Sequence, residues 1–302
     1  MSSPDVSVVI ATRDRPDFLR RAVAAALEQD YDGRIEVVVV FDQSSPEYSL
    51  ECQSGRRQVR IVANDRSPGL AGARNCGAEA STADLLSFCD DDDIWLPGKL
   101  RRQVQCLAGG YDTVVTGIVI DYVGKLTERV PTPADVTLAG LIRRRSFEAH
   151  PSTVVVRRAA FVGSIGEVDE EIPGGYGEDY DWIIRAARHG TIGVVPEPLV
   201  RVLWHQASFF AGRWETILLA LDYLLAKHPE FAGDPTGLAR IYGQKAFAHS
   251  GLGHRREAAH WAVQALRLSW RERRPYLALL VSFGLLRPES VLRWAHAAGR
   301  GI

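Results

Sequence analysis

Two largely apolar, β-branched runs separated by one amphipathic segment constrain the fold of this chain most. Residues 6–11 and 35–41 have the composition of strands that are buried on both faces of a parallel sheet. Pro16 suits the first turn of a helix between them. One apolar face repeats at helical spacing there, formed by Leu19, Ala22, Val23, Ala26 and Leu27. A strand, a helix and a strand within about forty residues predict a right-handed βαβ unit.

The same alternation continues along the first half of the chain. Residues 59–63, 85–89 and 113–123 have the pattern of further strands, and residues 69–82 that of a small-residue loop followed by a helix. We therefore expect a doubly wound α/β sheet. Sheets of this kind bind their ligands beyond the carboxyl ends of the strands.

From about residue 206 the sequence pattern indicates helices alone. An apolar helical face is formed by Ile217, Leu218, Leu221, Leu224 and Leu225. Further helical segments follow and are separated by glycine or proline. The sequence therefore predicts an α/β domain over residues 1–205 and a helical C-terminal domain over residues 206–302.

Composition and charge argue against several classes of protein. The chain has 302 residues, and its 36 basic and 37 acidic side chains give no reason to expect a nucleic-acid partner. Its four cysteines form no CxxC pair, which argues against a zinc cluster or a disulfide framework. No apolar stretch reaches the ~20 residues of a spanning helix, and no signal peptide is recognisable. We expect a cytoplasmic protein.

Four consecutive aspartates, Asp90 to Asp93, follow a predicted strand directly, and Asp42 ends another strand in the same way. Adjacent carboxylates repel one another, which raises their pKa values unless a cation is present. Mg²⁺ and Mn²⁺ prefer oxygen ligands, and proteins hold them with one or two carboxylates plus substrate phosphates. The aspartate run therefore predicts a divalent-metal site, and the alternative is an exposed acidic turn.

Five segments occur in a recognisable order along the chain. They are an opening strand and turn, a second strand that ends in aspartate, a glycine-rich Ala-Arg-Asn segment, a DxD motif and a later Glu-Asp motif, at residues 7–16, 38–44, 69–75, 90–95 and 177–182. Together they resemble the family 2 inverting glycosyltransferases. The resemblance covers roughly residues 5–205. It implies a GT-A-like (Rossmann-like), mixed and mainly parallel sheet flanked by helices, here with an α-helical C-terminal domain.

On the donor side, the resemblance implies a divalent Mn²⁺ or Mg²⁺ ion that is held by Asp90 and Asp92 and bridges the donor's diphosphate. His205 would reach the metal or the diphosphate, and the alternative for it is a structural histidine. The residues implied in nucleotide-sugar binding are Ala11, Thr12, Arg13, Asp42, Arg74, Asp90 and Asp91.

Asp42 and Arg74 each allow a second interpretation. Asp42 matches the family aspartate that accepts a hydrogen bond from the nucleotide base, and the alternative is a turn-forming aspartate. The residue before it is Phe41, where the family usually has another aspartate. Arg74 would approach the base or the diphosphate, where a guanidinium suits anionic oxygens. The alternative is an ion pair with the aspartate run.

Glu178 and Asp179 open a predicted helix. Direct displacement at an anomeric carbon needs a base that takes the proton of the acceptor hydroxyl. The resemblance implies that Asp179 is this base and that Glu178 orients or supports it. The alternative is structural, because acidic side chains in a first helical turn also stabilise the positive end of the helix. Residues 173–177 would form a loop that shapes the acceptor site.

The resulting prediction is an inverting, metal-dependent transfer of a sugar from a UDP- or dTDP-sugar to a hydroxyl. The acceptor would be a glycan, a lipid-linked compound or a small molecule. The alternatives are a nucleotidyltransferase acting on sugar phosphates and a non-catalytic scaffold that binds nucleotide-sugars. The tail carries arginines next to the apolar run 276–286, which suits peripheral contact with an anionic membrane. Packing on the catalytic domain or in a homo-oligomer is the alternative for that tail.

Overall fold

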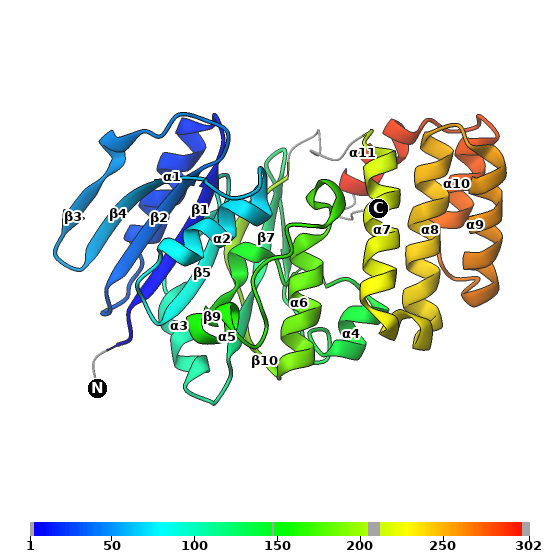
Figure 1. Ribbon diagram of the computed structural model, residues 1–302. Helices are drawn as coiled ribbons and strands as arrows, with labels where there is room; N and C mark the ends of the chain where they lie inside the picture. The colour runs from blue at the N-terminus through cyan, green and yellow to red at the C-terminus, as the bar shows by residue number, and fades with distance from the viewer. Residues whose placement is uncertain (1–2, 147, 205–211, 298–302) are drawn as a thin grey trace.

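The computed structural model describes residues 3–146, 148–204 and 212–297 (Figure 1). An α/β half is followed along the chain by an array of helices at one end of the molecule (Figure 1). None of the helices in the described ranges has the length and hydropathy that crossing a bilayer requires.

The sheet begins with four parallel strands. In spatial order they are β4 (Arg57–Ala63), β2 (Ile35–Phe41), β1 (Val6–Thr12) and β5 (Leu85–Asp90). Thr12 lies beside Phe41, and Ala11 lies beside Asp90. The carboxyl ends of three neighbouring strands therefore meet at one edge of the sheet, where Asp42 and the aspartate run begin. A short strand, β3 (Cys52–Ser54), pairs antiparallel with β4.

The other half of the sheet mixes strand directions. β9 (Val155–Arg157) runs antiparallel between β5 and β7 (Thr113–Tyr122), and β10 (Ile192–Leu203) runs parallel to β7. β6 (Ile94–Trp95) pairs antiparallel with β10, and β8 (Lys125–Arg129) with β7. The predicted fold class, a mixed and mainly parallel sheet with a helical C-terminal region, is confirmed.

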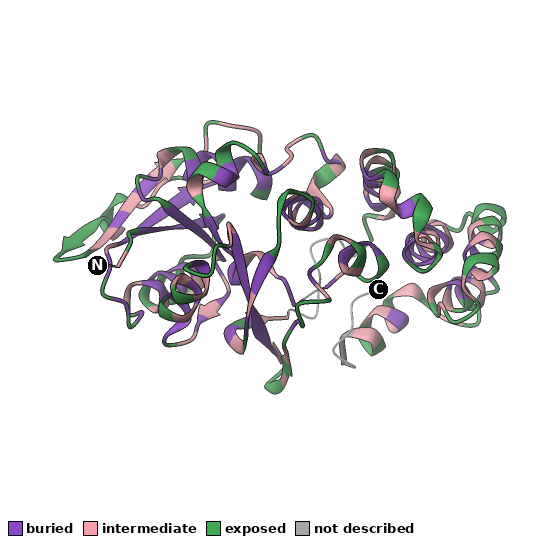
Figure 2. Ribbon diagram, turned by 90° about the horizontal axis from the view of Figure 1, so that it is seen from below, coloured by how far each residue is buried: buried purple, intermediate pink, exposed green. Residues whose placement is uncertain are grey.

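Helices cover both faces of this sheet (Figure 2). Those packed on it are α1 (Pro16–Leu27), α2 (Leu70–Ala80), α3 (Lys99–Leu107), α5 (Arg158–Val162) and α6 (Glu178–His189). α1 and α3 share a core cluster with Val8, whereas α2, α5 and α6 share another with Val9. Successive residues of a strand point to opposite faces, so β1 is buried on both sides, as its apolar run predicts.

The described C-terminal region has five α-helices, of which the first two pack on the α/β part and the last three share a separate core cluster with the second. They are α7 (Trp214–Lys227), α8 (Pro235–Gly251), α9 (Arg255–Leu268), α10 (Arg274–Ser282) and α11 (Pro288–Ala297). Leu224 and Ile241 belong to the same core cluster as α6. Gly237 lies so close to α4 (Leu138–Arg143) that an added Cβ would come 2.3 Å from the Ile142 carbonyl oxygen. The domain boundary near residue 205 stays a prediction.

A fully buried lysine is the least expected feature of the core. Lys99 Nζ, at the start of α3, lies 3.6 Å from the centroid of the Trp95 ring and 3.3 Å from Ser87 Oγ. No carboxylate within the described ranges forms an ion pair with this ammonium group, which lies against the Trp95 ring. Burial lowers the pKa of Lys99 to about 7.

Lys99→Met should stabilise the protein most at neutral and acid pH. The folded-state pKa, about 7, is below the ordinary value of 10.5, so between these values the unfolded chain binds more protons and stability rises with pH. Below pH 7 the substitution should therefore add on the order of 2–4 kcal/mol to the free energy of unfolding. The gain should shrink as the pH rises toward 10.5. Urea unfolding at pH 6 and pH 9 measures it, and an equal gain at both pH values would contradict this account of Lys99.

Candidate active site

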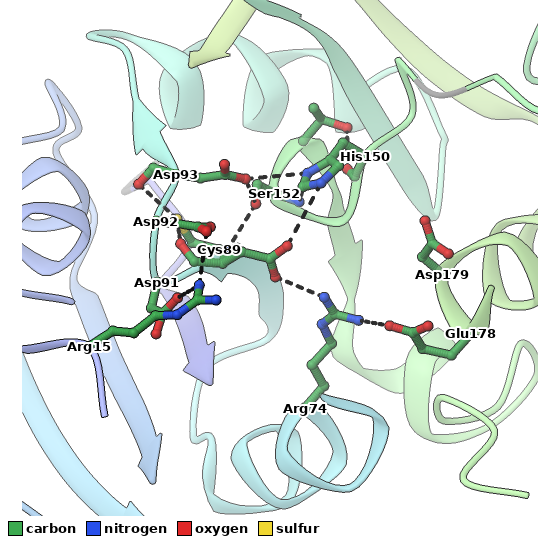
Figure 3. Close-up of polar contacts among 12 residues, drawn as sticks. Arg15, Arg74, Cys89, Asp91, Asp92, Asp93, His150, Ser152, Glu178 and Asp179 are labelled. Carbon is green, nitrogen blue, oxygen red and sulfur yellow. Dashed lines mark hydrogen bonds and ion pairs between the residues drawn. The ribbon is translucent and has the colours of Figure 1, made fainter. Parts of the chain in front are cut away.

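The aspartate run makes a closed turn at the end of β5 (Figure 3). The Asp93 amide donates to the Asp90 carbonyl oxygen at 3.1 Å. Asp91 Oδ2 accepts from Thr12 Oγ1 at 2.7 Å, which ties the ends of β1 and β5 together. Arg15 Nη1 lies 3.3 Å from Asp91 Oδ1 and 2.9 Å from Asp92 Oδ2. Arg15 lies in the recognised segment 7–16 but was not predicted as a site residue.

His150 forms a second cluster with the same turn, away from Arg15 (Figure 3). Its Nδ1 lies 3.3 Å from Asp93 Oδ2, and its Nε2 lies 3.7 Å from Asp90 Oδ2. Ser152 Oγ donates to Asp93 Oδ2 at 2.5 Å and accepts from the Asp90 amide at 3.0 Å. His150 and Ser152 were not predicted from the sequence, since their partners are more than fifty residues away along the chain.

The charges of this cluster favour a bound cation. Burial raises the pKa of Asp93 well above its ordinary value, and the charges of Asp90 and Asp92 raise it further. Burial also raises the pKa of Asp90, but the charges of Arg74 and His150 outweigh it, so the net pKa is lowered. One ligand atom each from Asp90, Asp93 and His150 lie within 4.8 Å of one another. Two carboxylate oxygens and an imidazole nitrogen fit Mn²⁺, and the oxygens also fit Mg²⁺.

The predicted metal ligands are only partly brought together. Asp90 belongs to the cluster with Asp93 and His150. Asp92 Oδ2 pairs with Arg15 instead, at 2.9 Å. His205 lies outside the described residues. The metal roles of Asp90, Asp92 and His205 therefore stay predictions.

Arg74 joins the aspartate run to Glu178, the neighbour of the predicted base Asp179 (Figure 3). From α2, its Nη2 donates to Asp90 Oδ1 at 2.8 Å and its Nη1 donates to Glu178 Oε1 at 2.9 Å. The side chain is 5% exposed. Burial lowers the pKa of Arg74, but the charges of Asp90 and Glu178 raise it more, so it stays charged. The ion pair that the sequence analysis held as the alternative is therefore present, and contact with a diphosphate stays a prediction.

Glu178 and Asp179 begin α6, as predicted. Arg145 Nη2 donates to both oxygens of Asp179 at 2.9 Å. Burial raises the pKa of Asp179, but the charge of Arg145 outweighs it and the net pKa lies below the ordinary value. Burial and the charge of Asp179 raise the pKa of Glu178 to about 7, against the charge of Arg74. Arg145 was not predicted, since it lies in a run of arginines without a recognisable motif.

The residues predicted for nucleotide binding lie along the same edge of the sheet. Ala11 and Thr12 are buried at the end of β1, and Arg13 is exposed. The Asp42 carboxylate accepts from Asn64 Nδ2 at 2.8 Å and from the Gly69 amide at 3.0 Å. Asp42 thus fixes the loop that leads into α2, which is the turn-forming role held as its alternative. Its contact with a nucleotide base stays a prediction.

Mn²⁺ should raise the melting temperature of the protein, and Asp90→Asn should remove most of that rise. A ligand present at a hundredfold excess over its dissociation constant stabilises the folded state by about 2.7 kcal/mol. Asp84→Asn is the matched control, because Asp84 is exposed and precedes the same strand that Asp90 ends. An equal Mn²⁺ effect on both variants would contradict the assignment of Asp90.

Sequence comparisons find relatives of this chain. Residues 7–162 match the family model described as glycosyl transferase family 2. The succinoglycan biosynthesis protein ExoU of Rhizobium meliloti is 29% identical over 203 residues, 62% of this chain and 58% of ExoU. The UDP-Glc:alpha-D-GlcNAc-diphosphoundecaprenol beta-1,3-glucosyltransferase WfaP of Escherichia coli is 32% identical over 101 residues, 33% of this chain and 39% of WfaP. Each match thus spans less than two thirds of the relative.

Solved structures resemble the whole chain. TarS of S. aureus, in complex with UDP-GlcNAc, has a TM-score of 0.60 at 15% identity, over 98% of this chain and 92% of that one. A mannosyltransferase of Pyrobaculum calidifontis, in complex with GDP-Man and Mn²⁺, has a TM-score of 0.57 at 17% identity, over 97% and 84%. These likenesses show the GT-A fold. Since the family model covers more than half of the chain, the protein belongs to glycosyl transferase family 2 and is a glycosyltransferase.

Proposed function

We propose that this glycosyltransferase moves a sugar, with inversion, from a UDP- or dTDP-sugar to a hydroxyl of a cell-surface or lipid-linked glycan. The main support is the hydrogen-bonded connection from Asp90 through Arg74 to Glu178, which joins a cation-binding edge and a carboxylate pair in one site. The names of ExoU and WfaP, and the UDP-GlcNAc bound to TarS, support this substrate class.

A divalent cation fits the aspartate edge. Asp90, Asp93 and His150 would hold it, and Asp92 is the further carboxylate that the DxD motif favours. When bound, the cation would neutralise the negative charge that grows on a departing nucleoside diphosphate. The raised pKa of Asp93 supports this assignment, because burial and the charges of Asp90 and Asp92 disfavour its ionised form until a cation binds. The Mn²⁺ in the mannosyltransferase complex supports it too.

Asp179 is the proposed base. Its side chain is 22% exposed, so an acceptor hydroxyl can approach it, and Arg145 fixes its orientation. The pKa lowered by Arg145 keeps this carboxyl ionised and able to accept a proton. Inverting displacement requires that proton transfer as the new bond forms. Family membership favours sugar transfer over nucleotidyl transfer. A nucleotidyl transfer would also leave the Glu178 and Asp179 pair without a role.

Asp179→Asn should lower kcat for transfer by roughly 10²–10⁴-fold, because an amide cannot accept the proton. Metal-dependent binding of UDP, followed by thermal shift, should remain, since Asp179 lies on the acceptor side of Arg74. Glu171→Gln is the control, because Glu171 is an exposed carboxylate in the loop before the same helix. Wild-type kcat in Asp179→Asn would show that another group is the base.

The transfer rate should rise with pH through about 7, where Glu178 loses its proton. A charged Glu178 raises the proton affinity of the neighbouring Asp179 by like-charge repulsion, which makes Asp179 a stronger base. In Glu178→Gln this rise should be absent. Measurement of kcat between pH 5.5 and 8.5 tests this coupling between Glu178 and Asp179. The same pH profile in the wild type and in Glu178→Gln would contradict it.

A further inference from the structure

Helix α10 lies with α9 at the end of the molecule opposite β3, and one of its two apolar faces is exposed (Figure 1). The inner face is buried against α8 and α9, and it is formed by Pro275, Ala278 and Val281. The outer face repeats at i, i+4 and i+7, and it is formed by Tyr276, Leu280 and Phe283. The apolar run 276–286 is thus divided: one side belongs to the core of the tail, and the other faces water.

Two further apolar side chains extend this outer face at its ends. The Tyr276 hydroxyl donates to the Trp270 carbonyl oxygen at 2.9 Å, and the Leu285 amide donates to the Leu280 carbonyl oxygen at 3.0 Å. Trp270 is 70% exposed, Phe283 75% and Leu285 68%. We call Trp270, Tyr276, Leu280, Phe283 and Leu285 the tail patch. Large exposed apolar side chains gathered in this way mark a surface that binds something.

The tail patch lies in the part of the chain that is richest in arginine. Residues 252–302 contain nine arginines and three glutamates, whereas the whole chain has 36 basic and 37 acidic residues. The Arg271 Cζ atom lies 5.2 Å from the centroid of the Trp270 ring. Four exposed arginines form no ion pair with a carboxylate of the described residues, and these are Arg271, Arg273, Arg287 and Arg293. The surface around the patch is therefore positively charged.

An anionic bilayer complements both properties of this surface. Its phosphates attract arginines, and apolar side chains enter the boundary between headgroups and acyl chains. Trp and Tyr suit that boundary, because each has an apolar ring and a polar group. A second copy of the chain fits less well, since an isologous contact through the same patch would bring like charges face to face.

We propose that the tail patch binds the surface of an anionic lipid bilayer. Trp270, Phe283 and Leu285 enter the boundary between headgroups and acyl chains, and Arg271 and Arg287 contact lipid phosphates. The contact is peripheral, because no helix of the described ranges is long and apolar enough to cross a bilayer. This inference goes beyond the proposed function, since it assigns a partner to the tail and does not depend on the sugar that is transferred.

Co-sedimentation of the full chain with lipid vesicles tests the proposal without any transfer reaction. One kind of vesicle contains phosphatidylcholine alone, and the other contains equal parts of phosphatidylcholine and phosphatidylglycerol. The chain should bind the anionic vesicles roughly tenfold more tightly or better, and a rise from about 0.05 to about 0.5 M NaCl should weaken that binding. Equal binding to both kinds of vesicle, or binding to neither, would overturn the proposal.

Two substitutions in the tail patch test its apolar contribution. Phe283→Ser combined with Leu285→Ser should weaken binding to the anionic vesicles roughly tenfold or more, because less apolar surface leaves water. Tyr48→Ser combined with Leu219→Ser is the matched control, since these side chains are 62% and 61% exposed and lie outside the patch. Circular dichroism checks that both variants fold. Equal loss of binding in both would overturn the proposal.

One arginine substitution tests the contribution of charge. Arg287→Gln should weaken binding to the anionic vesicles roughly fivefold, which corresponds to about 1 kcal/mol for one arginine at a membrane surface. Arg21→Gln is the control, because Arg21 is an exposed arginine of α1. Equal binding by the two variants would contradict the contact between Arg287 and lipid phosphates.

Tryptophan fluorescence shows which face of the bound chain meets the lipid. Trp270 and Trp294 are exposed, whereas the other tryptophans are buried or half-buried. Brominated phosphatidylglycerol in the vesicles should quench the wild type and should quench Trp270→Phe combined with Trp294→Phe much less. Equal quenching of both proteins would place another face on the membrane and overturn the proposal.

Sedimentation velocity identifies the case of a subunit interface. If the wild type dimerises, Phe283→Ser combined with Leu285→Ser is monomeric, and neither kind of vesicle is bound, then the tail patch joins two copies of the chain and the membrane proposal is wrong.

Discussion

The guanidinium of Arg74 holds two carboxylates from opposite sides of the site, Asp90 at the end of β5 and Glu178 at the start of α6. All three are placed by different elements, so the ion pairs fix how the sheet edge, α2 and α6 meet. Asn75 adds to this, because its amide group donates to the Val168 carbonyl oxygen at 2.8 Å and accepts from the Val168 amide at 2.9 Å. Loss of one partner from such a buried pair typically costs about 3–5 kcal/mol. The Ala-Arg-Asn segment therefore has a structural task as well as its proposed contact with the donor.

The neighbouring carboxyl groups of α6 have different proton affinities. Arg145 holds the pKa of Asp179 below its ordinary value, whereas burial and the charge of Asp179 raise the pKa of Glu178 to about 7. Environments that separate the pKa values of adjacent groups are typical of acid and base pairs in active sites. Arg240, from the tail, lies against the same Tyr180 ring as Arg145. The helical region therefore packs against the side chains that surround Asp179.

The strands and the catalytic helix could be predicted because their signals are local. The runs that form β1 and β2 are rich in β-branched residues. Asp179 belongs to the Glu-Asp motif at the start of an amphipathic helix. His150, Arg145 and Arg240 could not be predicted, since each contacts the site from a segment distant in sequence and has no periodic pattern. The three-residue strand β9 was not predicted for the same reason, because its antiparallel pairing depends on β5 and β7 rather than on its own residues. Asp42 shows the reverse case: its position was predicted, but its carboxylate is already occupied by Asn64 and the Gly69 amide.

The central claim is that the carboxyl edge of the sheet binds a nucleoside diphosphate together with a divalent cation. Thermal shift with UDP, dTDP, GDP, ADP and CMP, each with and without Mn²⁺, tests it most directly. We expect stabilisation by UDP or dTDP that requires Mn²⁺ and is lost in Asp92→Ala. If no nucleotide stabilises the folded protein with any metal, the donor site is wrongly assigned and the scaffold interpretation gains.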